Sequence, residues 1–411
     1  MNIYFAPMEG ITAYPYRMTH MTLYGGVDRY FLPFVQAHQT LTLKNKEKKD
    51  LAPEHNPGGR SVPQLMSNKA PLALAYIRII ADMGYREINF NLGCPSGTVT
   101  AKKNGAGFLT DPDAMDAFFY QLFDGLQEEG FLVDRGIAAG DILRAENPEK
   151  AGFRTEAPQA DGLQPERPRK DEQQTENLHP EKMTDPTRPS VPRHLRISVK
   201  TRIGMMSTDR IDDVVRVYGR YPFSEIIVHP RLGKDAYRGP VNMQAFDRFY
   251  EGLDCPVSYN GDIITASDAW EIIRRYPRLH AIMIGRGLLR DPALAEKIRE
   301  GAAWHKAEQA GTGIWEGAAW EKAGQAGTGI REGAAWHGAG PEDPRLSLLL
   351  SRLEAAWLDA LEGDRTSTLY RLKEFWSYLA LNYEDVQGIR KKISKCRNLS
   401  DYHDIRASLG L

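Results

Sequence analysis

A cysteine near the end of a short apolar run is the side chain best placed for chemistry in this sequence. Cys94 follows Glu87–Phe90, a run that predicts a buried strand, and Pro95 ends that strand because proline has no N–H to donate. A free thiol has a pKa of about 8.5, so it is mostly protonated at neutral pH and can serve as a general acid. The alternative is a buried cysteine without a chemical role, the commonest fate of this residue type. The position at a strand end favours the chemical interpretation.

Polar residues also follow other strand-like runs. Lys200 and Arg202 come at the end of one, and His229 at the end of another, although a lone histidine in such a place is more often structural. The stretches Asn260–Asp262 and Gly285–Gly287 follow the last two runs. Their glycines let backbone N–H groups approach an anion, and an arginine in the second stretch adds charge, so together they predict a phosphate-binding site.

About eight apolar runs alternate with helix-length segments up to residue 300. This alternation predicts a (β/α)8 TIM barrel, with an open doubly wound sheet as the competing fold. Because the polar residues follow the strands throughout, instead of gathering at one switch point, we favour the barrel. Barrels keep their active site at the carboxyl ends of the strands, so these polar side chains are expected to meet in one site.

Composition narrows the class of protein. The chain has 411 residues, 42% of them hydrophobic, and a net charge of −1, so a nucleic-acid partner would have to meet local basic patches. Three widely separated cysteines predict neither a disulfide framework nor a metal site. The sequence has no apolar run long enough for a membrane span and no signal-like start. We expect a cytoplasmic protein without a membrane contact, and a monomer.

Two segments interrupt the alternation and suggest domain limits. Residues 134–193 are rich in proline and charged residues, which predicts a disordered insertion in a barrel that spans 1–300. In 301–343 the motif of Gly301–Trp304 recurs twice, which indicates a duplicated linker or, alternatively, a partner-binding arm that uses the tryptophans. From 344 to 411 leucines recur at helical spacing, which predicts an all-α C-terminal domain.

Taken in order, these motifs resemble the tRNA-dihydrouridine synthases, flavin enzymes that reduce uridine in tRNA. The resemblance covers most of the chain outside the two interruptions. The segments that carry it are Ala6–Gly10, Gln64, Asn91–Pro95, Lys200–Gly204, His229–Arg231, Tyr237 with Gly239, Asn260–Asp262, Gly285–Gly287 and Arg371-x-Lys373-x-x-Trp376. Pro230 departs from the family's usual glycine, and Ser96–Lys103 departs from its commoner loop.

The resemblance implies FMN at the barrel mouth, with NADPH or NADH as electron donor. Hydride would pass from the reduced flavin to C6 of uracil, and the catalytic Cys94 would protonate C5. The flavin contacts that it implies are Pro7, Met8, Gln64, Lys200, His229, Asn260, Gly261, Asp262, Gly285 and Arg286.

A tRNA substrate requires contacts to phosphates and to an extruded base. The basic run Arg390–Arg397 predicts such a surface on the C-terminal domain, although a solvated helix face would have the same composition. The residues expected to contact RNA are Asn91, Arg202, Arg371, Lys373, Arg390, Lys391 and Lys392.

Two other functions fit parts of the sequence. The first is an FMN barrel reductase of a free pyrimidine or another small enone, which would not need a basic helical domain. The second is a non-catalytic RNA-binding protein built on a barrel that has lost its chemistry. The presence of Cys94, Lys200 and His229 together speaks against the second.

Overall fold

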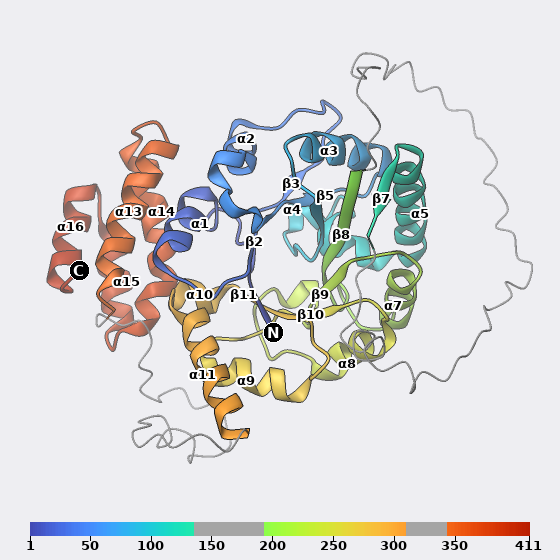
Figure 1. Ribbon diagram of the computed structural model, residues 1–411. Helices are drawn as coiled ribbons and strands as arrows, with labels where there is room; N and C mark the ends of the chain where they lie inside the picture. The colour runs from blue at the N-terminus through green and yellow to red at the C-terminus, as the bar shows by residue number, and fades with distance from the viewer. Residues whose placement is uncertain (135–192, 310–342) are drawn as a thin grey trace, which may run out of the picture.

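The computed structural model describes residues 1–134, 193–309 and 343–411. Parallel strands form a closed barrel surrounded by helices, and a bundle of helices stands at one side (Figure 1). The strands on the barrel path are β1 Asn2–Phe5, β2 Arg29–Phe31, β3 Val35–Gln36, β4 Ser61–Val62, β5 Gln64–Met66, β6 Glu87–Leu92, β8 Arg193–Arg202, β9 Glu225–His229, β10 Val257–Tyr259 and β11 Ala281–Ile284.

Two of the eight strand positions of the barrel are each occupied by two short strands in succession, and this closes the barrel. The hydrogen-bonded order is β3-β5-β6-β8-β9-β10-β11-β1-β2-β4. Only Pro63 separates β4 from β5, and three residues including Pro33 separate β2 from β3, so each end strand of this path directly follows or precedes another strand of the path in the chain. Proline divides these strands because it cannot donate to the ladder. The predicted (β/α)8 barrel itself is confirmed.

Apolar side chains fill both the barrel and the layer around it. Tyr4, Phe31 and Met283 belong to a small cluster inside the strands. A larger cluster packs the outer strand faces against the helices. Those helices are α1 Tyr14–Leu23, α2 Asn45–Leu51, α3 Ala70–Asp82, α4 Gly97–Thr100, α5 Pro112–Glu128, α7 Ile211–Gly219, α8 Met243–Gly252, α9 Ala266–Arg275, α10 Arg286–Arg290 and α11 Leu294–Gln309. The sequence analysis did not predict α2.

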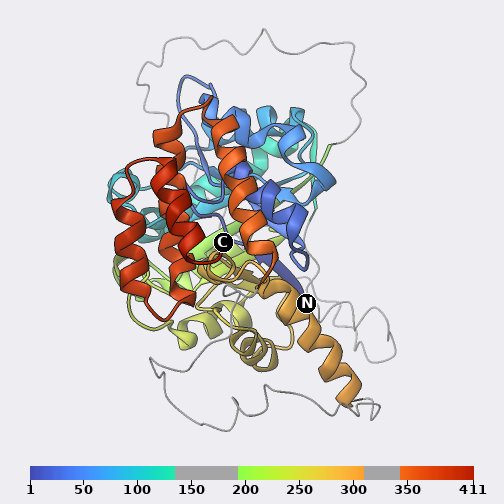
Figure 2. The same ribbon diagram turned by 90° about the vertical axis from the view of Figure 1, so that its left-hand side faces the viewer.

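The C-terminal helices form a bundle against the barrel, as the sequence predicts. They are α13 Arg345–Ala360, α14 Arg365–Leu379, α15 Val386–Lys395 and α16 Leu399–Ser408. The buried leucines of α13 recur at helical spacing, and α13 packs on α1 while α14 packs on α10 (Figure 2). Because α10 follows the last barrel strand, α14 reaches the end of the barrel where the strands finish.

The two interruptions fall mostly outside the described residues, and so do the expectations for 134–193 and 301–343. A short strand, β7 Phe131–Val133, pairs with the start of β8 before the first gap. The barrel's last helix, α11, continues to Gln309 and so passes the expected boundary at 300. None of the described helices has the length and apolar character that crossing a bilayer requires.

We expect the flavin content of the purified protein to be unchanged when residues 135–192 are replaced by a Gly/Ser linker. The linker needs about a dozen residues, because β7 and β8 pair in parallel and a parallel connection must cross over. The strand that carries Lys200 is paired with β6 and β9 along its length, independently of the replaced segment. The flavin absorbance per protein measures this, and a colourless variant that still folds would contradict the prediction.

Candidate active site

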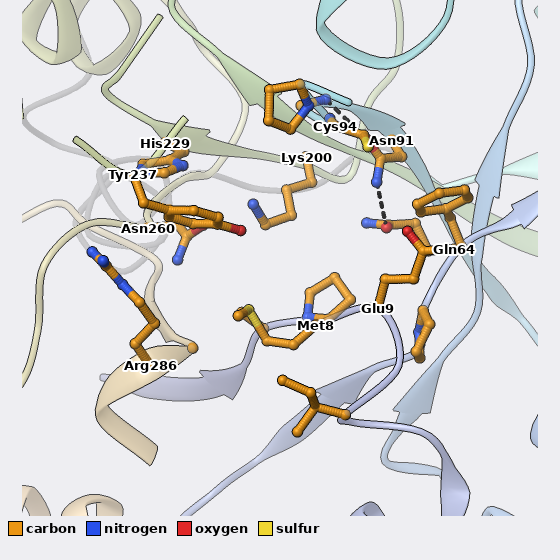
Figure 3. Close-up of a pocket in the computed structure, with 18 of the residues that line it drawn as sticks. Met8, Glu9, Gln64, Asn91, Cys94, Lys200, His229, Tyr237, Asn260 and Arg286 are labelled. Carbon is orange, nitrogen blue, oxygen red and sulfur yellow. Dashed lines mark hydrogen bonds between the residues drawn. The ribbon is translucent and has the colours of Figure 1, made fainter. Parts of the chain in front are cut away.

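One cavity of about 300 Å³ opens at the carboxyl ends of the barrel strands (Figure 3). Cys94, Asn91, Gln64 and Glu9 lie at one end of it in this view, and His229, Tyr237, Asn260 and Arg286 lie at the other, with Lys200 and Met8 between them. The structure brings the candidate residues of the barrel into its walls. They are Pro7, Met8, Gln64, Asn91, Cys94, Lys200, Arg202, His229, Asn260, Gly261, Asp262, Gly285 and Arg286.

The loop after β6 holds Cys94 in place. Asn91 Oδ1 accepts hydrogen bonds from the backbone N–H groups of Gly93 at 3.0 Å and Cys94 at 2.9 Å. The Cys94 carbonyl accepts one from Ala106 at 3.0 Å. Gly105 has a φ of +54°, and a Cβ there would lie 2.6 Å from that carbonyl, so this close approach requires glycine. The thiol therefore stands on a braced turn at the cavity wall.

The surroundings of Cys94 keep its thiol protonated. Burial raises the pKa of Cys94, and the negative charge of Glu9 acts in the same direction. The hydrogen bond from Ser96 and the charges of Arg202 and Lys200 oppose this rise but do not cancel it. A nucleophilic cysteine needs the opposite shift, so this thiol is suited to donate a proton.

Lys200 is a half-buried lysine in the cavity wall, and the described residues give it no ion-pair partner. Among the described residues its Nζ makes no hydrogen bond or ion pair that balances the charge. Burial, and then repulsion from Arg202, lowers the pKa of Lys200 to about 7 from an ordinary value of 10.5. An unpaired buried charge is costly unless a ligand compensates it. The site is therefore built for an anionic or electron-rich group beside Lys200.

In the flavin-free protein we expect Lys200 to make the free energy of unfolding increase between about pH 7 and pH 10. The folded pKa is near 7 while the unfolded lysine titrates at its ordinary value. The unfolded chain therefore binds more protons in this window, and stability rises with pH. Urea denaturation of wild type and of Lys200→Met between about pH 7 and pH 10 measures this change in the free energy of unfolding. The prediction fails if the stability difference between the two proteins does not change with pH.

The end of the cavity opposite Cys94 is cationic overall. Arg231 and Arg286 both pair with Asp262, so two guanidinium groups face one carboxylate. Burial pushes the pKa of Asp262 upward, but the hydrogen bonds and charges of the two arginines outweigh it and hold that pKa below its ordinary value. Burial and four nearby cations lower the pKa of His229, so the imidazole is neutral. This end retains one net positive charge for an anion.

Amide side chains connect the strands around the cavity. Gln64 Nε2 donates to Asn89 at 2.7 Å, and Gln64 Oε1 accepts from Asn91 Nδ2 at 2.7 Å. Asn260 Nδ2 donates to the Met283 carbonyl at 2.8 Å. An amide NH₂ has two hydrogens, so the second hydrogen of Gln64 remains for a ligand. Asn91, which we expected to contact RNA, has its side chain engaged by the catalytic loop.

The other expected RNA contacts lie in two places. Arg202 is in the active-site cavity and is buried, with its guanidinium bonded to the carbonyls of Gly93 and Leu232. Arg371, Lys373 and Arg390 line a separate groove between α14 and α15. Lys391 and Lys392 are exposed on α15, outside this groove.

The sequence analysis gave no site role to several residues that line the active-site cavity. Among them are Glu9, Phe34, Tyr237, Glu374 and Tyr378. Glu9 and Tyr237 lie inside motifs that the sequence analysis quoted, so their positions beside known site residues were a usable signal. Glu374 and Tyr378 are one helical turn apart on α14, and only the packing of the bundle against the barrel brings them to the cavity.

Comparison with known proteins gives one consistent result. The tRNA-dihydrouridine(16) synthase of Pseudomonas syringae pv. tomato is 24% identical over 320 residues, which cover 77% of this chain and 79% of the relative. The enzyme of the same name from Cupriavidus necator is 24% identical over 304 residues, or 72% and 73% of the two chains. Among solved structures, the old yellow enzyme from Trypanosoma cruzi matches with a TM-score of 0.42 at 7% identity, over 73% of this chain and 88% of its own.

A family model also matches the barrel part of the chain. The model described as dihydrouridine synthase (Dus) matches residues 4–125 and 181–325, which is more than half of the chain. The matched segments include the strands that carry Cys94, Lys200, His229 and the two glycine-containing turns. The chain belongs to the dihydrouridine synthase family.

Proposed function

We propose that this protein reduces a uridine in tRNA to dihydrouridine, with FMN as cofactor and NADPH as electron donor. One observation carries the proposal: a protonated, half-buried thiol lines the same cavity as Lys200, for which the described residues supply no ion-pair partner. Reducing a carbon–carbon double bond requires one hydride and one proton. Membership of the dihydrouridine synthase family supports uridine as the group reduced.

The residues of the cavity fit a flavin mononucleotide. Lys200 would stabilise negative charge on the reduced ring. Gln64 has an amide hydrogen left for the ring edge, and neutral His229 can hydrogen-bond a ring carbonyl or the ribityl-phosphate tail. Arg286, beside Gly285 at the cationic end, would hold the phosphate. Pro7, Met8, Asn260, Gly261 and Asp262 would complete the contacts.

When bound, reduced FMN supplies the hydride that C6 of uracil receives. The protein's own residues supply the rest. Cys94 Sγ holds the proton that goes to C5, and Asn91 fixes the turn that aims the thiol. The half-buried position of Cys94 limits the access of water to the thiol. The thiolate left after transfer regains a proton from solvent, which restores Cys94.

The tRNA would lie across the mouth of the cavity and the helical domain. Arg371, Lys373 and Arg390 line one groove, and Lys391 and Lys392 add exposed charge beside it. Arg202 lies within the cavity and would face the target base. Both relatives described above are named for position 16, so we propose uridine 16 as the target.

The test uses purified protein, an unmodified tRNA transcript and NADPH, with nucleosides mapped by mass spectrometry. We expect one dihydrouridine, at position 16, and slower flavin reduction with NADH than with NADPH. Reduction of free uracil without RNA would favour the alternative, a small-molecule reductase. A protein that binds tRNA but purifies without flavin and forms no dihydrouridine would instead be a binding protein.

A further inference from the structure

A second cavity, here called the side cavity, lies between the barrel rim and the helical domain. It measures about 160 Å³. Glu9, Pro33 and Phe34 line both the side cavity and the active-site cavity. The two cavities are therefore neighbours that share these three residues as a common wall.

The walls of the side cavity suit a flat aromatic ring. They are mostly apolar, with Pro15 and Leu51 from the barrel side, and Trp357 and Leu361 from α13 and the residue that follows it. A dry apolar cavity of about 150 Å³ is large enough to hold a benzene ring. The side cavity can thus accept one ring of a nucleobase next to the aromatic side chain of Phe34.

The charge around the side cavity suits a phosphate at its rim. The two acidic groups that line it from α2 are already engaged: Glu47 accepts from the Lys44 N–H at 2.8 Å, and Asp50 pairs with Arg17 at 2.9 Å. Lys46 is exposed on the same helix and makes no ion pair among the described residues. Glu9 also lines the cavity and carries a negative charge, so Lys46 offers a local contact for one phosphate and not a net positive field.

Arg371 connects this rim to the helical domain. Its guanidinium lies over the Trp357 ring, 5.4 Å from the ring centre, and donates to Glu374 at 3.1 Å. A Cβ on Gly10 would lie only 2.8 Å from Arg371 Nη1, so the arginine rests against the barrel rim. The side cavity is thus continuous with the domain that we propose binds tRNA.

We propose that the side cavity binds the base of the nucleotide adjacent to the target uridine; this rests on the proposed function. Extruding a base removes a stacking partner from its neighbour. A second aromatic pocket replaces that lost stacking, and Lys46 meets the phosphate nearby. Stacking of one base on aromatic side chains can change affinity by about tenfold or more.

The test variant is Ala360→Leu, which fills the side cavity from the last residue of α13. The Ala360 carbonyl accepts a hydrogen bond from Lys49 Nζ at 3.0 Å, and the substitution keeps that carbonyl. Ala355→Leu is the matched control, because Ala355 is exposed on the same helix and does not line the cavity. Thermal melting and flavin content show whether each variant folds.

Each protein is titrated with three full-length tRNAs: one intact, and one abasic on each side of the target uridine. We expect wild type to bind one of the abasic tRNAs about tenfold more weakly than the intact one. Ala360→Leu should bind the intact tRNA about as weakly as wild type binds that abasic tRNA. It should bind the abasic tRNA no more weakly than it binds the intact one. Ala355→Leu should behave as wild type.

The side-cavity proposal would be overturned if an abasic site lowered the tRNA affinity of wild type and of Ala360→Leu equally. It would also be overturned if an abasic site on neither side of the target uridine lowered the affinity of wild type. Slower flavin reduction by NADPH in Ala360→Leu would also overturn it, because it would identify the dinucleotide as the occupant. Dihydrouridine formation by wild type is measured in parallel. If wild type forms no dihydrouridine, the proposed function fails. If wild type forms dihydrouridine but the abasic site has the same effect in Ala360→Leu as in wild type, only the side-cavity proposal fails.

Discussion

Cys94→Ala is expected to keep bound flavin and tRNA affinity while dihydrouridine formation falls by about 10²- to 10⁴-fold, the usual contribution of a positioned general acid. The thiol is held by backbone hydrogen bonds to the Asn91 side chain and by the Gly105 turn, so removing Sγ leaves the loop unchanged. Its raised pKa means that the proton is present at neutral pH. Single-turnover reaction of the prereduced enzyme with tRNA measures the loss on the step that uses the proton.

Cys255→Ala is the matched control for this experiment. Cys255 is a buried cysteine just before β10, at the end of the barrel opposite the cavity. We expect it to affect stability slightly and the single-turnover rate not at all. Wild-type turnover in Cys94→Ala would remove the proton-donor role from Cys94.

Lys200→Met is expected to produce two effects of opposite sign. Flavin affinity should fall about 10- to 100-fold, since a charged hydrogen bond to a buried ligand is worth about 1.5–3 kcal/mol. The flavin-free protein should become more stable at neutral pH, because the described residues give this ammonium no partner and its pKa is already lowered to about 7. Methionine keeps much of the side-chain volume, so a packing loss would not imitate the result.

Fluorescence titration of flavin and urea denaturation of the flavin-free protein separate these two effects. Lys48→Met is a suitable control, because Lys48 is exposed on α2 and lines neither cavity. A Lys200→Met protein that is less stable without flavin would show that the lysine is a structural residue and not a site for the cofactor.

The sequence predicts the barrel and its rim well because both depend on local order. Apolar runs of strand length alternate with helices, and a closed parallel barrel brings the carboxyl end of every strand to one face. Cys94, Lys200 and His229 could therefore be assigned to one site from their positions after three different strands. The short breaks at Pro33 and Pro63 divide two strands into shorter ones, but the carboxyl ends of the strands still lie at the same face of the barrel.

The wall contributed by the helical domain could not be predicted in the same way. Glu374 and Tyr378 reach the active-site cavity only because α14 packs on α10, a contact between segments about 90 residues apart in the chain. Nothing in the local pattern of α14 distinguishes its cavity face from its solvent face. Hydrogen bonding was equally hidden: the sequence does not show that the Asn91 amide bonds to Gln64 and to the Cys94 N–H, and its contact with RNA stays a prediction.

The central claim is that the Cys94 thiol, in one flavin pocket built by separate strands, gives its proton to C5 of a uridine in tRNA. The direct measurement is a reaction of the prereduced enzyme with tRNA in deuterated water, with the dihydrouridine analysed by mass spectrometry and NMR. Because the thiol exchanges with solvent, the account predicts deuterium on one face of C5, and labelled product that forms about 10²- to 10⁴-fold more slowly in Cys94→Ala. Unlabelled C5, or equally rapid labelling in Cys94→Ala, would contradict it.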